Sequence, residues 1–262
     1  MQSTASLNSA IPTATIIIPA YNEEERIGKV LREIADFISK NNVNWNVIVS
    51  IDGNDGTEDI VKKMMGEYNF ISYDKNHGRG GKGYAIKRVV GKATGEYTIL
   101  MDADGSLDFS KITDSINYMK DYDIIIFDRY SNKNNRIPFF RRMPSRGFNI
   151  LVRAILGIKV NDTQSGYKII RTDMIREAFS KIAVTDAFYD VALLYYLNEF
   201  NPIIKEIDEV TYNHESNSKF NVISLTLGMG ISLVAFRVRH SRLYKYIPDW
   251  ARELYSRKFK WI

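Results

Sequence analysis

Two carboxylates that lie close together in the chain, Asp102 and Asp104, follow a run of five residues at 97–101 that favours a β-strand. The run Tyr-Thr-Ile-Leu-Met is mostly apolar, which is typical of a strand buried on both faces of a parallel sheet. Ligands of open α/β sheets bind beyond the carboxyl ends of such strands, and side chains two apart on an extended chain point the same way. Both carboxylates are therefore predicted to face one ligand.

Two negative charges this close together are unfavourable unless a cation lies between them. Carboxylate oxygens suit Mg²⁺ and Mn²⁺, which also bridge to phosphate oxygens. We therefore expect Asp102 and Asp104 to bind Mg²⁺ or Mn²⁺ together with a ligand that carries phosphate. A surface turn with two solvated aspartates is the alternative, but such a turn would not need the apolar strand before it.

Strands and helices are predicted to alternate along the first half of the chain. Apolar runs predict strands at 14–19, 45–51, 70–73, 97–101 and 123–127. Apolar residues at helical spacing predict helices between these strands. This alternation indicates right-handed crossovers and an α/β fold with a mainly parallel sheet.

Beyond Asp128 the pattern changes. We expect a basic loop over 129–142, and then helices at 146–156, 174–182 and 191–200 with strands at 167–170 and 203–210. An apolar stretch at 222–236 follows, which is shorter than the ~20 residues that a membrane-spanning helix needs.

Polar residues also end the first two predicted strands, at the same edge of the sheet. Pro19 ends the first strand, with Tyr21 and Glu23 directly after it, and Asp52 comes at the end of the second. Tyr21 offers an aromatic face for a base, and Asp52 can accept hydrogen bonds from a base edge.

The glycine-rich segment 78–83, Gly-Arg-Gly-Gly-Lys-Gly, offers the cations Arg79 and Lys82 beside flexible backbone amides. It also matches the pattern G-x-G-x-x-G. A dinucleotide-binding fold places that pattern after its first strand, with an acidic residue about 20 positions later. Here it follows the third predicted strand, so a dehydrogenase is the less favoured interpretation. The sequence contains no G-x-x-x-x-G-K-[ST], which excludes a P-loop.

Three motifs follow one another along the chain: Pro19-Ala20-Tyr21-Asn22-Glu23, Asp52-Gly53-Asn54-Asp55-Gly56-Thr57 and Asp102-Ala103-Asp104. In this order they resemble the family 2 glycosyltransferases of the GT-A fold. Three later motifs extend the likeness to the polyprenyl-phosphate branch, the dolichyl-phosphate mannose and glucose synthases. These are Asp128-Arg129-Tyr130, Asp162-Thr163-Gln164-Ser165-Gly166-Tyr167-Lys168 and Ser218-Lys219-Phe220. The resemblance covers about residues 14–220, and the ordered set is far more specific than any one motif.

The resemblance implies a GT-A (Rossmann-like) catalytic domain at residues 1–220 that binds a nucleotide sugar. In it Asp52 contacts the base, Asp102 contacts the ribose or the metal, and Asp104 is the main metal ligand. The rest of the donor site is formed by Pro19, Tyr21, Glu23 and Lys82. The chain departs from the family here, because Ile51 precedes Asp52 where relatives carry a second aspartate, and the loop that follows is one residue shorter.

The resemblance also implies that Arg129 and Lys168 bind the acceptor phosphate or the donor diphosphate, with Ser165 beside them. We expect Asp104, Arg129 and Lys168 to be the catalytic residues. Many relatives carry Gly-Ser before the arginine, where this chain has Phe127-Asp128. The sequence offers no reason for an acidic residue at position 128, next to a phosphate site.

Chemical reasoning supports a phosphate acceptor. The leaving diphosphate needs its charge neutralised, which a divalent ion and Lys or Arg side chains provide. A phosphate monoester is already ionised near neutral pH, its second pKa being about 6, so transfer to it needs no general base. We expect inverting transfer of a hexose to a dolichyl or polyprenyl phosphate, with UDP-glucose slightly favoured over GDP-mannose by segment 162–164 and the glycine loop.

Two other functions stay open at this point. One is a family 2 glycosyltransferase that acts on a glycan hydroxyl, which would need a carboxylate base such as Asp190. The other is a basic module that binds nucleic acid, which we do not favour, because the acidic pair suits a small phosphate-bearing ligand.

Positive charge is concentrated in two segments. Residues 129–153 contain seven Lys or Arg and no acid, and residues 237–262 contain eight Lys or Arg and two acids. Basic residues interleaved with aromatic ones suit a membrane interface. We expect Arg141, Arg142 and Arg146 to contact lipid headgroups and the acceptor. We also expect residues 221–262 to form a membrane-associating helical appendage, with the protein lying peripherally on the cytoplasmic face of a membrane.

Composition sets the broad limits. The chain has 262 residues, 45% of them hydrophobic and 26% charged, which suits a soluble globular protein with a large core. It has no cysteine, which excludes disulfides and thiol chemistry and fits a reducing compartment. Residues 1–13 lack a basic start followed by an apolar run, so we expect no signal peptide.

Overall fold

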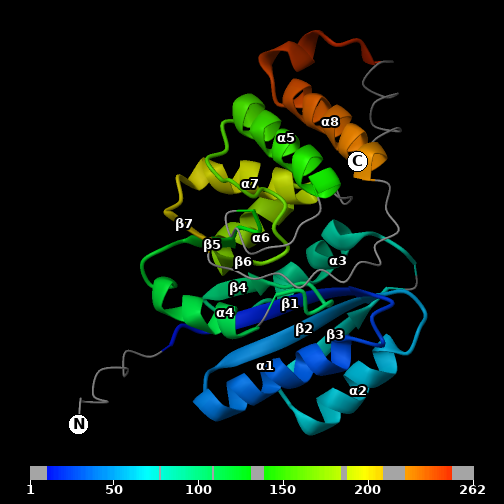
Figure 1. Cartoon of the computed structure of the whole chain (residues 1–262), viewed down its shortest axis with the longest axis vertical. Helices are drawn as coiled ribbons and strands as arrows, with labels where there is room; N and C mark the ends of the chain where they lie inside the picture. The colour runs from blue at the N-terminus through cyan, green and yellow to red at the C-terminus, as the bar shows by residue number, and fades with distance from the viewer. Residues whose placement is uncertain are drawn as a thin grey trace.

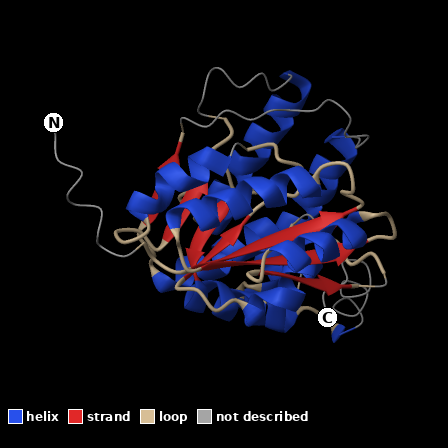
Figure 2. Ribbon diagram, turned by 90° about the horizontal axis from the view of Figure 1, so that it is seen from below, coloured by secondary structure: helices blue, strands red, loops and turns tan. Residues whose placement is uncertain are grey.

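The structure, a computed structural model, describes residues 11–76, 78–107, 109–130, 139–183, 188–208 and 222–249. Within these residues seven strands form one sheet in the order β3-β2-β1-β4-β6-β5-β7. Figure 1 shows the arrangement of the elements, and Figure 2 shows that helices cover both faces of the sheet. The predicted α/β class is confirmed.

The strands are β1 Ala14–Tyr21, β2 Trp45–Asp52, β3 Ile71–Lys75, β4 Tyr97–Leu100, β5 Ile124–Phe127, β6 Lys168–Arg171 and β7 Ile204–Ile207. The α-helices are α1 Ile27–Asn41, α2 Thr57–Glu67, α3 Lys82–Val89, α4 Phe109–Asp114, α5 Phe139–Leu156, α6 Thr172–Lys181, α7 Tyr189–Leu197 and α8 Val222–Arg239. Most begin within a few residues of the sequence prediction. The exception is α5, which begins at Phe139, inside the segment expected to be a loop.

Most neighbouring strands run parallel, as predicted. The exception is β6, which lies antiparallel between β4 and β5 and pairs Lys168 with Leu100. The chain leaves β5 at the carboxyl edge of the sheet and, after α5, returns at that same edge, so β6 must run back. This direction brings the motif 162–168 to the edge where β4 ends.

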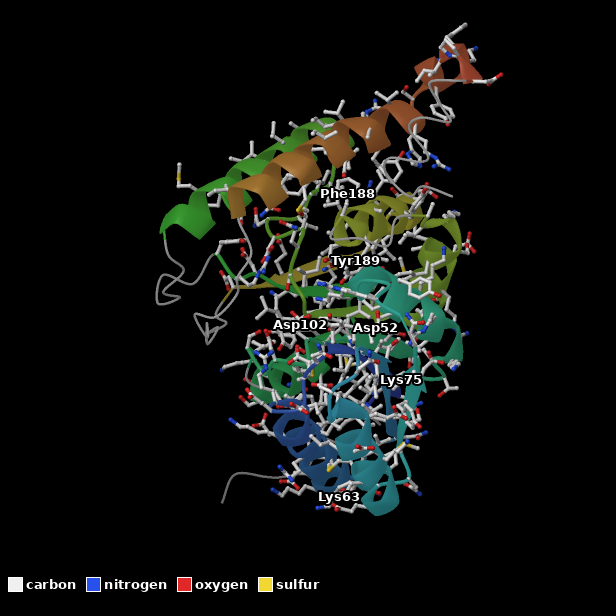
Figure 3. All side chains as sticks on the ribbon, turned by 90° about the vertical axis from the view of Figure 1, so that its right-hand side faces the viewer. Asp52, Lys63, Lys75, Asp102, Phe188 and Tyr189 are labelled. Atoms are coloured by element: carbon white, nitrogen blue, oxygen red, sulfur yellow. The ribbon has the colours of Figure 1, made fainter. Side chains whose placement is uncertain are left out.

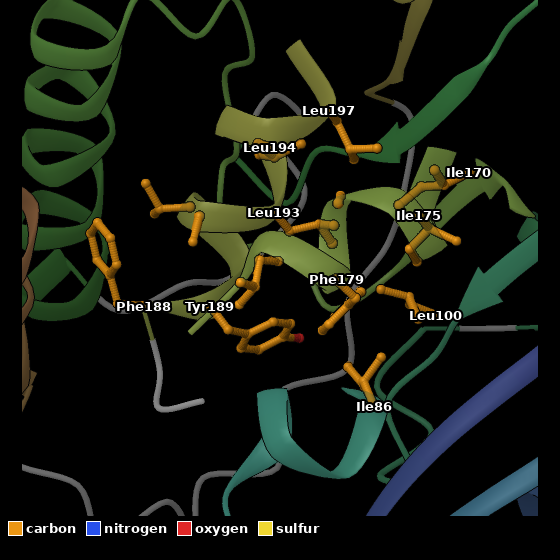
Figure 4. Close-up of a cluster of buried hydrophobic side chains, with 14 of the residues drawn as sticks. Ile86, Leu100, Ile170, Ile175, Phe179, Phe188, Tyr189, Leu193, Leu194 and Leu197 are labelled. Atoms are coloured by element: carbon orange, nitrogen blue, oxygen red, sulfur yellow. The ribbon is translucent and has the colours of Figure 1, made fainter. Parts of the chain in front are cut away.

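Alternation of side chains along the strands divides the core into two layers. Ile16 and Ile18 of β1 face one layer with α1, α2 and α4, whereas Ile17 faces the other with α3, α6 and α7. Figure 4 shows the second layer, in which Phe179 and Tyr189 lie near Ile86 of α3 and Leu100 of β4.

The helices α5 and α8 pack against each other at one end of the molecule (Figure 1). Leu233 and Phe236 of α8 are buried in the same core as residues of α6 and α7, so this helix packs on the same layer as they do. Among the described residues, no helix combines the length and the apolar character that crossing a membrane requires.

Candidate active site

A pocket of about 350 Å³ opens where β1, β2 and β4 end. Tyr21 and Asp52 are paired in register at the ends of β1 and β2, as expected for neighbouring parallel strands. The pocket is lined by Pro19, Ala20, Tyr21, Glu23, Asp52, Arg79, Gly81, Lys82, Ala85, Asp102, Ala103 and Asp104. All the residues predicted for the donor site, and both predicted metal ligands, therefore lie around one cavity of a size that suits a small ligand. Figure 3 labels two of these residues, Asp52 and Asp102, near the middle of the molecule.

The two aspartates reach the pocket by a different geometry from the one predicted. β4 ends at Leu100, and Ala103 and Asp104 form a turn rather than a continued strand. Asp104 accepts a hydrogen bond from the amide of Ser106 at 2.9 Å, and Gly105 has a φ of 64°, which favours glycine. The turn, and not strand alternation, brings both carboxylates to one cavity.

The segment 165–168 supports this acidic turn from the neighbouring strand. The buried Tyr167 hydroxyl accepts a hydrogen bond from the Leu107 amide at 3.1 Å. Gly166 lies against Asp102, because a Cβ atom at Gly166 would be 1.8 Å from Asp102 Oδ2. The motif predicted to bind phosphate thus also shapes the acidic turn.

Lys82, at the start of α3, donates a hydrogen bond from its ammonium to Asp102 Oδ1. Burial acts to raise the pKa of Asp102, but the charge and hydrogen bond of Lys82, with Arg129 and Lys168 nearby, lower it overall. Burial acts to lower the pKa of Lys82, but Asp102 and Asp190 raise it overall. Both groups are therefore held in their charged forms near neutral pH.

Glu23 has the opposite shift. Burial raises the pKa of its carboxyl group, and the charges of Asp104 and Asp102 raise it further, whereas Arg26 lowers it. Arg26 Nη2 lies 2.7 Å from Glu23 Oε2 in a salt bridge between neighbouring turns of the chain. The pocket therefore contains an excess of negative charge next to Glu23.

The motif 52–57 fixes the turn that follows β1. The Thr57 hydroxyl accepts a hydrogen bond from the Glu23 amide at 2.8 Å, and Asn22 Oδ1 accepts one from the Asn54 amide at 3.2 Å. Gly53 has a φ of 100°, and a Cβ atom there would be 2.1 Å from Asn22 Oδ1. The two motifs that the sequence placed at neighbouring strand ends thus hold each other in position.

Asp52 is engaged by a residue that the sequence analysis missed. Arg88 of α3 donates a hydrogen bond to Asp52 Oδ1 at 3.0 Å, and the Gly80 amide donates one to Asp52 Oδ2 at 3.0 Å. Arg88 also bonds Asp74 at the end of β3. No local pattern marks Arg88, since it lies 36 residues from Asp52 in the chain.

Arg129 makes a two-pronged ion pair with the buried Asp162, at 2.7 and 2.9 Å. This pair links the two motifs that were predicted to meet the acceptor. Asp128 Oδ1 accepts a hydrogen bond from the Tyr130 amide at 2.7 Å, which explains the acid at this position as part of the turn that presents Arg129. Arg146 is exposed on α5 and donates to the Tyr130 carbonyl at 3.3 Å.

Lys168 and Ser165 lie deeper than predicted. Lys168 is 1% exposed, and its ammonium bonds Asp190 at 2.6 Å and the Ser165 carbonyl. Neither residue lines the pocket. Direct contact of Lys168 with a phosphate would require this buried pair to separate, so its contacts support a positioning role instead. The side chains of Arg141 and Arg142, and the whole of Ser218-Lys219-Phe220, lie outside the described residues.

Comparison with known proteins agrees with the motifs. The profile of "Glycosyl transferase family 2" matches residues 15–179. The chain belongs to glycosyl transferase family 2. It is similar to dolichyl-phosphate beta-glucosyltransferases from Dictyostelium discoideum, with 27% identity over 86% of this chain and 74% of the relative, and from Homo sapiens, with 28% identity over 86% and 75%. The predicted resemblance to the dolichyl-phosphate sugar synthases is confirmed.

Solved structures show the same fold. Glucosyl-3-phosphoglycerate synthase from Mycobacterium tuberculosis, in complex with Mn²⁺, UDP and glucosyl-3-phosphoglycerate, has a TM-score of 0.64 and 16% identity over 86% of this chain and 80% of that one. A complex of the same enzyme with Mn²⁺, UDP-glucose and phosphoglyceric acid has a TM-score of 0.65, covering 91% of this chain and 81% of that one. The family 2 chain described here thus has the GT-A fold.

The pocket's donors suit a divalent cation held jointly with a substrate. Among the described residues, no group of three or more His, Cys, Asp or Glu side chains is placed to hold a metal ion alone. Asp102 and Asp104 share the pocket, and their charges reach Glu23. One or two carboxylates, completed by phosphate oxygens and water, are the usual protein contribution to a Mg²⁺ site. The residues therefore fit Mg²⁺ or Mn²⁺ bound together with a nucleoside diphosphate.

Proposed function

We propose that this glycosyltransferase moves glucose from UDP-glucose to dolichyl phosphate, or a related polyprenyl phosphate, with inversion at the anomeric carbon. The observation that carries the proposal is the single pocket that joins Asp52, Lys82 and the acidic turn in a chain similar to dolichyl-phosphate beta-glucosyltransferases. GDP-mannose is the second candidate donor.

Donor binding is assigned to the residues around the pocket. Tyr21 and Asp52 would meet the nucleoside, Tyr21 with its ring and Asp52 as a hydrogen-bond acceptor. Lys82 would place its ammonium beside the diphosphate, and Asp102 and Asp104 would hold Mg²⁺ or Mn²⁺. When bound, that ion would neutralise the negative charge that develops on the leaving diphosphate.

Acceptor binding is assigned to Arg129 and its surroundings. The guanidinium pairs with Asp162 of the motif 162–168, and its positive charge helps to lower the pKa of Asp102 in the acidic turn. A planar guanidinium with five donors can bond a carboxylate and a phosphate at the same time. Holding the acceptor phosphate near the donor would offset the repulsion between two anionic substrates.

The contacts of Asp190 favour a phosphate acceptor over a glycan hydroxyl. A hydroxyl acceptor needs a general base in the site, and Asp190 was the candidate for that role. The Asp190 side chain is 9% exposed, and its carboxylate accepts a hydrogen bond from the buried Lys168 ammonium at 2.6 Å. A phosphate monoester needs no such base, because it is ionised near neutral pH.

Peripheral attachment to a membrane would bring the enzyme to a polyprenyl acceptor. On α5, the apolar residues Met143, Ile150 and Leu151 are 56%, 63% and 51% exposed, and the exposed Arg146 and Arg153 lie among them. On the adjoining α8, Ile231 and Val234 are each 57% exposed. Exposed apolar side chains beside basic ones suit an interface with anionic lipid headgroups. The cytoplasmic face remains the expected side.

The activity is tested with radiolabelled UDP-glucose and GDP-mannose, each incubated with dolichyl phosphate and Mg²⁺ or Mn²⁺. We expect label from UDP-glucose to partition into organic solvent, and Asp104→Asn to abolish this transfer. Lys63→Glu, an exposed substitution on α2 far from the pocket (Figure 3), is the matched control and should remain active. Label that reaches dolichyl phosphate only from GDP-mannose, or from neither donor, would refute the proposal.

Membrane attachment has its own test. We expect the wild-type protein to sediment with vesicles that contain anionic lipid at low salt, and the double variant Arg146→Glu/Arg153→Glu to stay in the supernatant. Lys63→Glu changes charge at the end of the molecule opposite α5 and α8 and should still sediment. If the wild-type protein does not sediment, or if both variants sediment equally, attachment through this face is wrong.

A further inference from the structure

Arg88 projects from α3 toward the ends of β2 and β3 and contacts both strands. Its Nη1 donates to Asp52 Oδ1 at 3.0 Å, its Nε to Asp74 Oδ2 at 2.8 Å and its Nη2 to Ser50 Oγ at 3.1 Å. The Arg88 side chain is 16% exposed and that of Asp52 is 4% exposed. Since the donors of a guanidinium are held in a rigid plane, these contacts fix the direction of the Asp52 carboxylate.

We propose that Arg88 is a positioning residue that gives the pocket its selectivity for the nucleobase, acting through Asp52. This inference rests on the proposed function, because it assumes that the pocket binds a nucleoside diphosphate. Arg88 is not among the residues that line the pocket, so its effect on a ligand must pass through Asp52.

The hydrogen bonds that Asp52 already makes define what it can still bind. Oδ1 accepts from Arg88 and Oδ2 accepts from the Gly80 amide at 3.0 Å. A carboxylate has about four lone-pair sites, so capacity remains on both oxygens. Because an ionised carboxylate only accepts hydrogen bonds, the matching base edge carries ring N–H donors. Uracil and guanine have such an edge, whereas the ring nitrogens of cytosine and adenine at that edge are acceptors.

The same carboxylate also holds the glycine loop. The Gly80 amide bonds Asp52, and a Cβ atom at Gly80 would be 2.0 Å from the Tyr84 ring, so this loop lies close against α3. The loop carries Arg79, whose guanidinium lies 4.5 Å from the centre of the Tyr21 ring, and Lys82, which bonds Asp102. Loss of Arg88 would therefore disturb the nucleotide side of the pocket while the acidic turn after β4 keeps its own supports.

A purely structural role for Arg88 predicts a different result, and Asp74 provides the matched control. Asp74 Oδ2 bonds Arg88, and Oδ1 bonds Lys92 at 2.8 Å, but Asp74 is not among the residues that line the pocket. Asp74→Asn weakens the attachment of Arg88 to β3 and leaves its bond to Asp52 in place. If Arg88 only stabilised the fold, Asp74→Asn and Arg88→Gln would have similar effects on the pocket.

The test measures the affinities of UDP, GDP, CDP and ADP by calorimetry with saturating Mn²⁺, together with kcat and KM for the sugar donor. For Arg88→Gln we expect the Kd of UDP to rise about tenfold or more and the preference for UDP over CDP to shrink. KM should rise while kcat changes by less than about twofold. The Kd of UDP for Arg88→Lys should lie between those of the wild type and Arg88→Gln, because a lysine keeps the positive charge but loses the planar set of guanidinium donors. Asp74→Asn should keep the wild-type affinities and selectivity.

Two results would distinguish a failure of the proposed function from a failure of this inference alone. If the wild-type protein binds none of the four nucleotides, the proposed function fails and this inference fails with it. If the wild-type protein binds UDP selectively and Arg88→Gln retains that selectivity, or if Arg88→Gln lowers only kcat, the inference alone is overturned. Thermal melting of each variant identifies any loss of nucleotide affinity that is due to unfolding. Arg88→Lys is the milder change for this comparison.

Discussion

Lys82 and Asp102 form an ion pair across the pocket, joining the first turn of α3 to the acidic turn that follows β4. The sequence predicted both residues for the donor site but gave no reason to pair them. Their side chains are 33% and 29% exposed, so the pair is open to a ligand on one side. Lys82 thus supplies a positive charge at the same carboxylate that is proposed to bind a divalent ion.

Replacing Lys82 by methionine should strengthen the binding of Mn²⁺ in the absence of nucleotide. The ammonium competes with the metal for Asp102, and an ion pair of partly exposed groups is worth up to about 1 kcal/mol, so we expect up to about a fivefold gain. The affinity for UDP should fall in the same variant, since the diphosphate loses a cation. Paramagnetic resonance of free Mn²⁺ measures the first effect, with Lys63→Met as the control. Unchanged or weaker Mn²⁺ binding by Lys82→Met would contradict the pairing.

Glu23→Gln should stabilise the protein near neutral pH. The folded-state pKa of Glu23 is raised above 4.5, mainly by burial, so the stability that this group contributes is complete below pH 4.5 and is lost as the pH rises through the raised value. Each unit of that shift costs about 1.4 kcal/mol. Glutamine removes this cost. The free energy of unfolding of the variant should therefore exceed that of the wild type at pH 7 and equal it at pH 4. Urea denaturation at both pH values measures this, and a variant that is less stable at pH 7 would disprove it.

Gly166→Ala should weaken metal and donor binding. The added Cβ would meet Asp102 Oδ2 at 1.8 Å, so the carboxylate must turn away from its place beside Lys82. We expect a loss of transfer activity of about a hundredfold, the scale that follows from misplacing a binding group by about 1 Å. Gly66→Ala in α2 is the control, because nothing lies within 4 Å of its Cβ, and alanine should stabilise that helix by about 0.5–1 kcal/mol. Equal activity of the two variants would show that Gly166 is not needed for the position of Asp102.

Lys168→Met should destabilise the fold by about 3–5 kcal/mol, because it leaves the carboxylate of Asp190 buried without its partner. The two side chains are only 1% and 9% exposed. Adding Asp190→Leu should restore most of the lost stability, since an apolar pair of similar volume can replace a buried ion pair. Urea denaturation of the wild type, both single variants and the double variant gives the four free energies of unfolding of a double-mutant cycle. A loss below about 1 kcal/mol for Lys168→Met would mean that Lys168 is not held as the structure places it.

The sequence alone determined the strands, their order along the chain and the residues at their ends. Apolar runs and helical spacing are local signals, and the carboxyl ends of parallel strands share one edge of a sheet. Asp52, Tyr21 and the pair Asp102 and Asp104 could therefore be assigned to one site before their distances were known.

Only the tertiary structure decided which side chains meet and how deep each one lies. The direction of β6 depends on where α5 returns the chain to the sheet, and this direction buries Lys168 against Asp190. Arg88 reaches Asp52 because α3 packs over β2, a contact between segments 36 residues apart that no local pattern encodes. Pairing and burial follow from long-range packing, whereas strand ends follow from the local distribution of apolar residues.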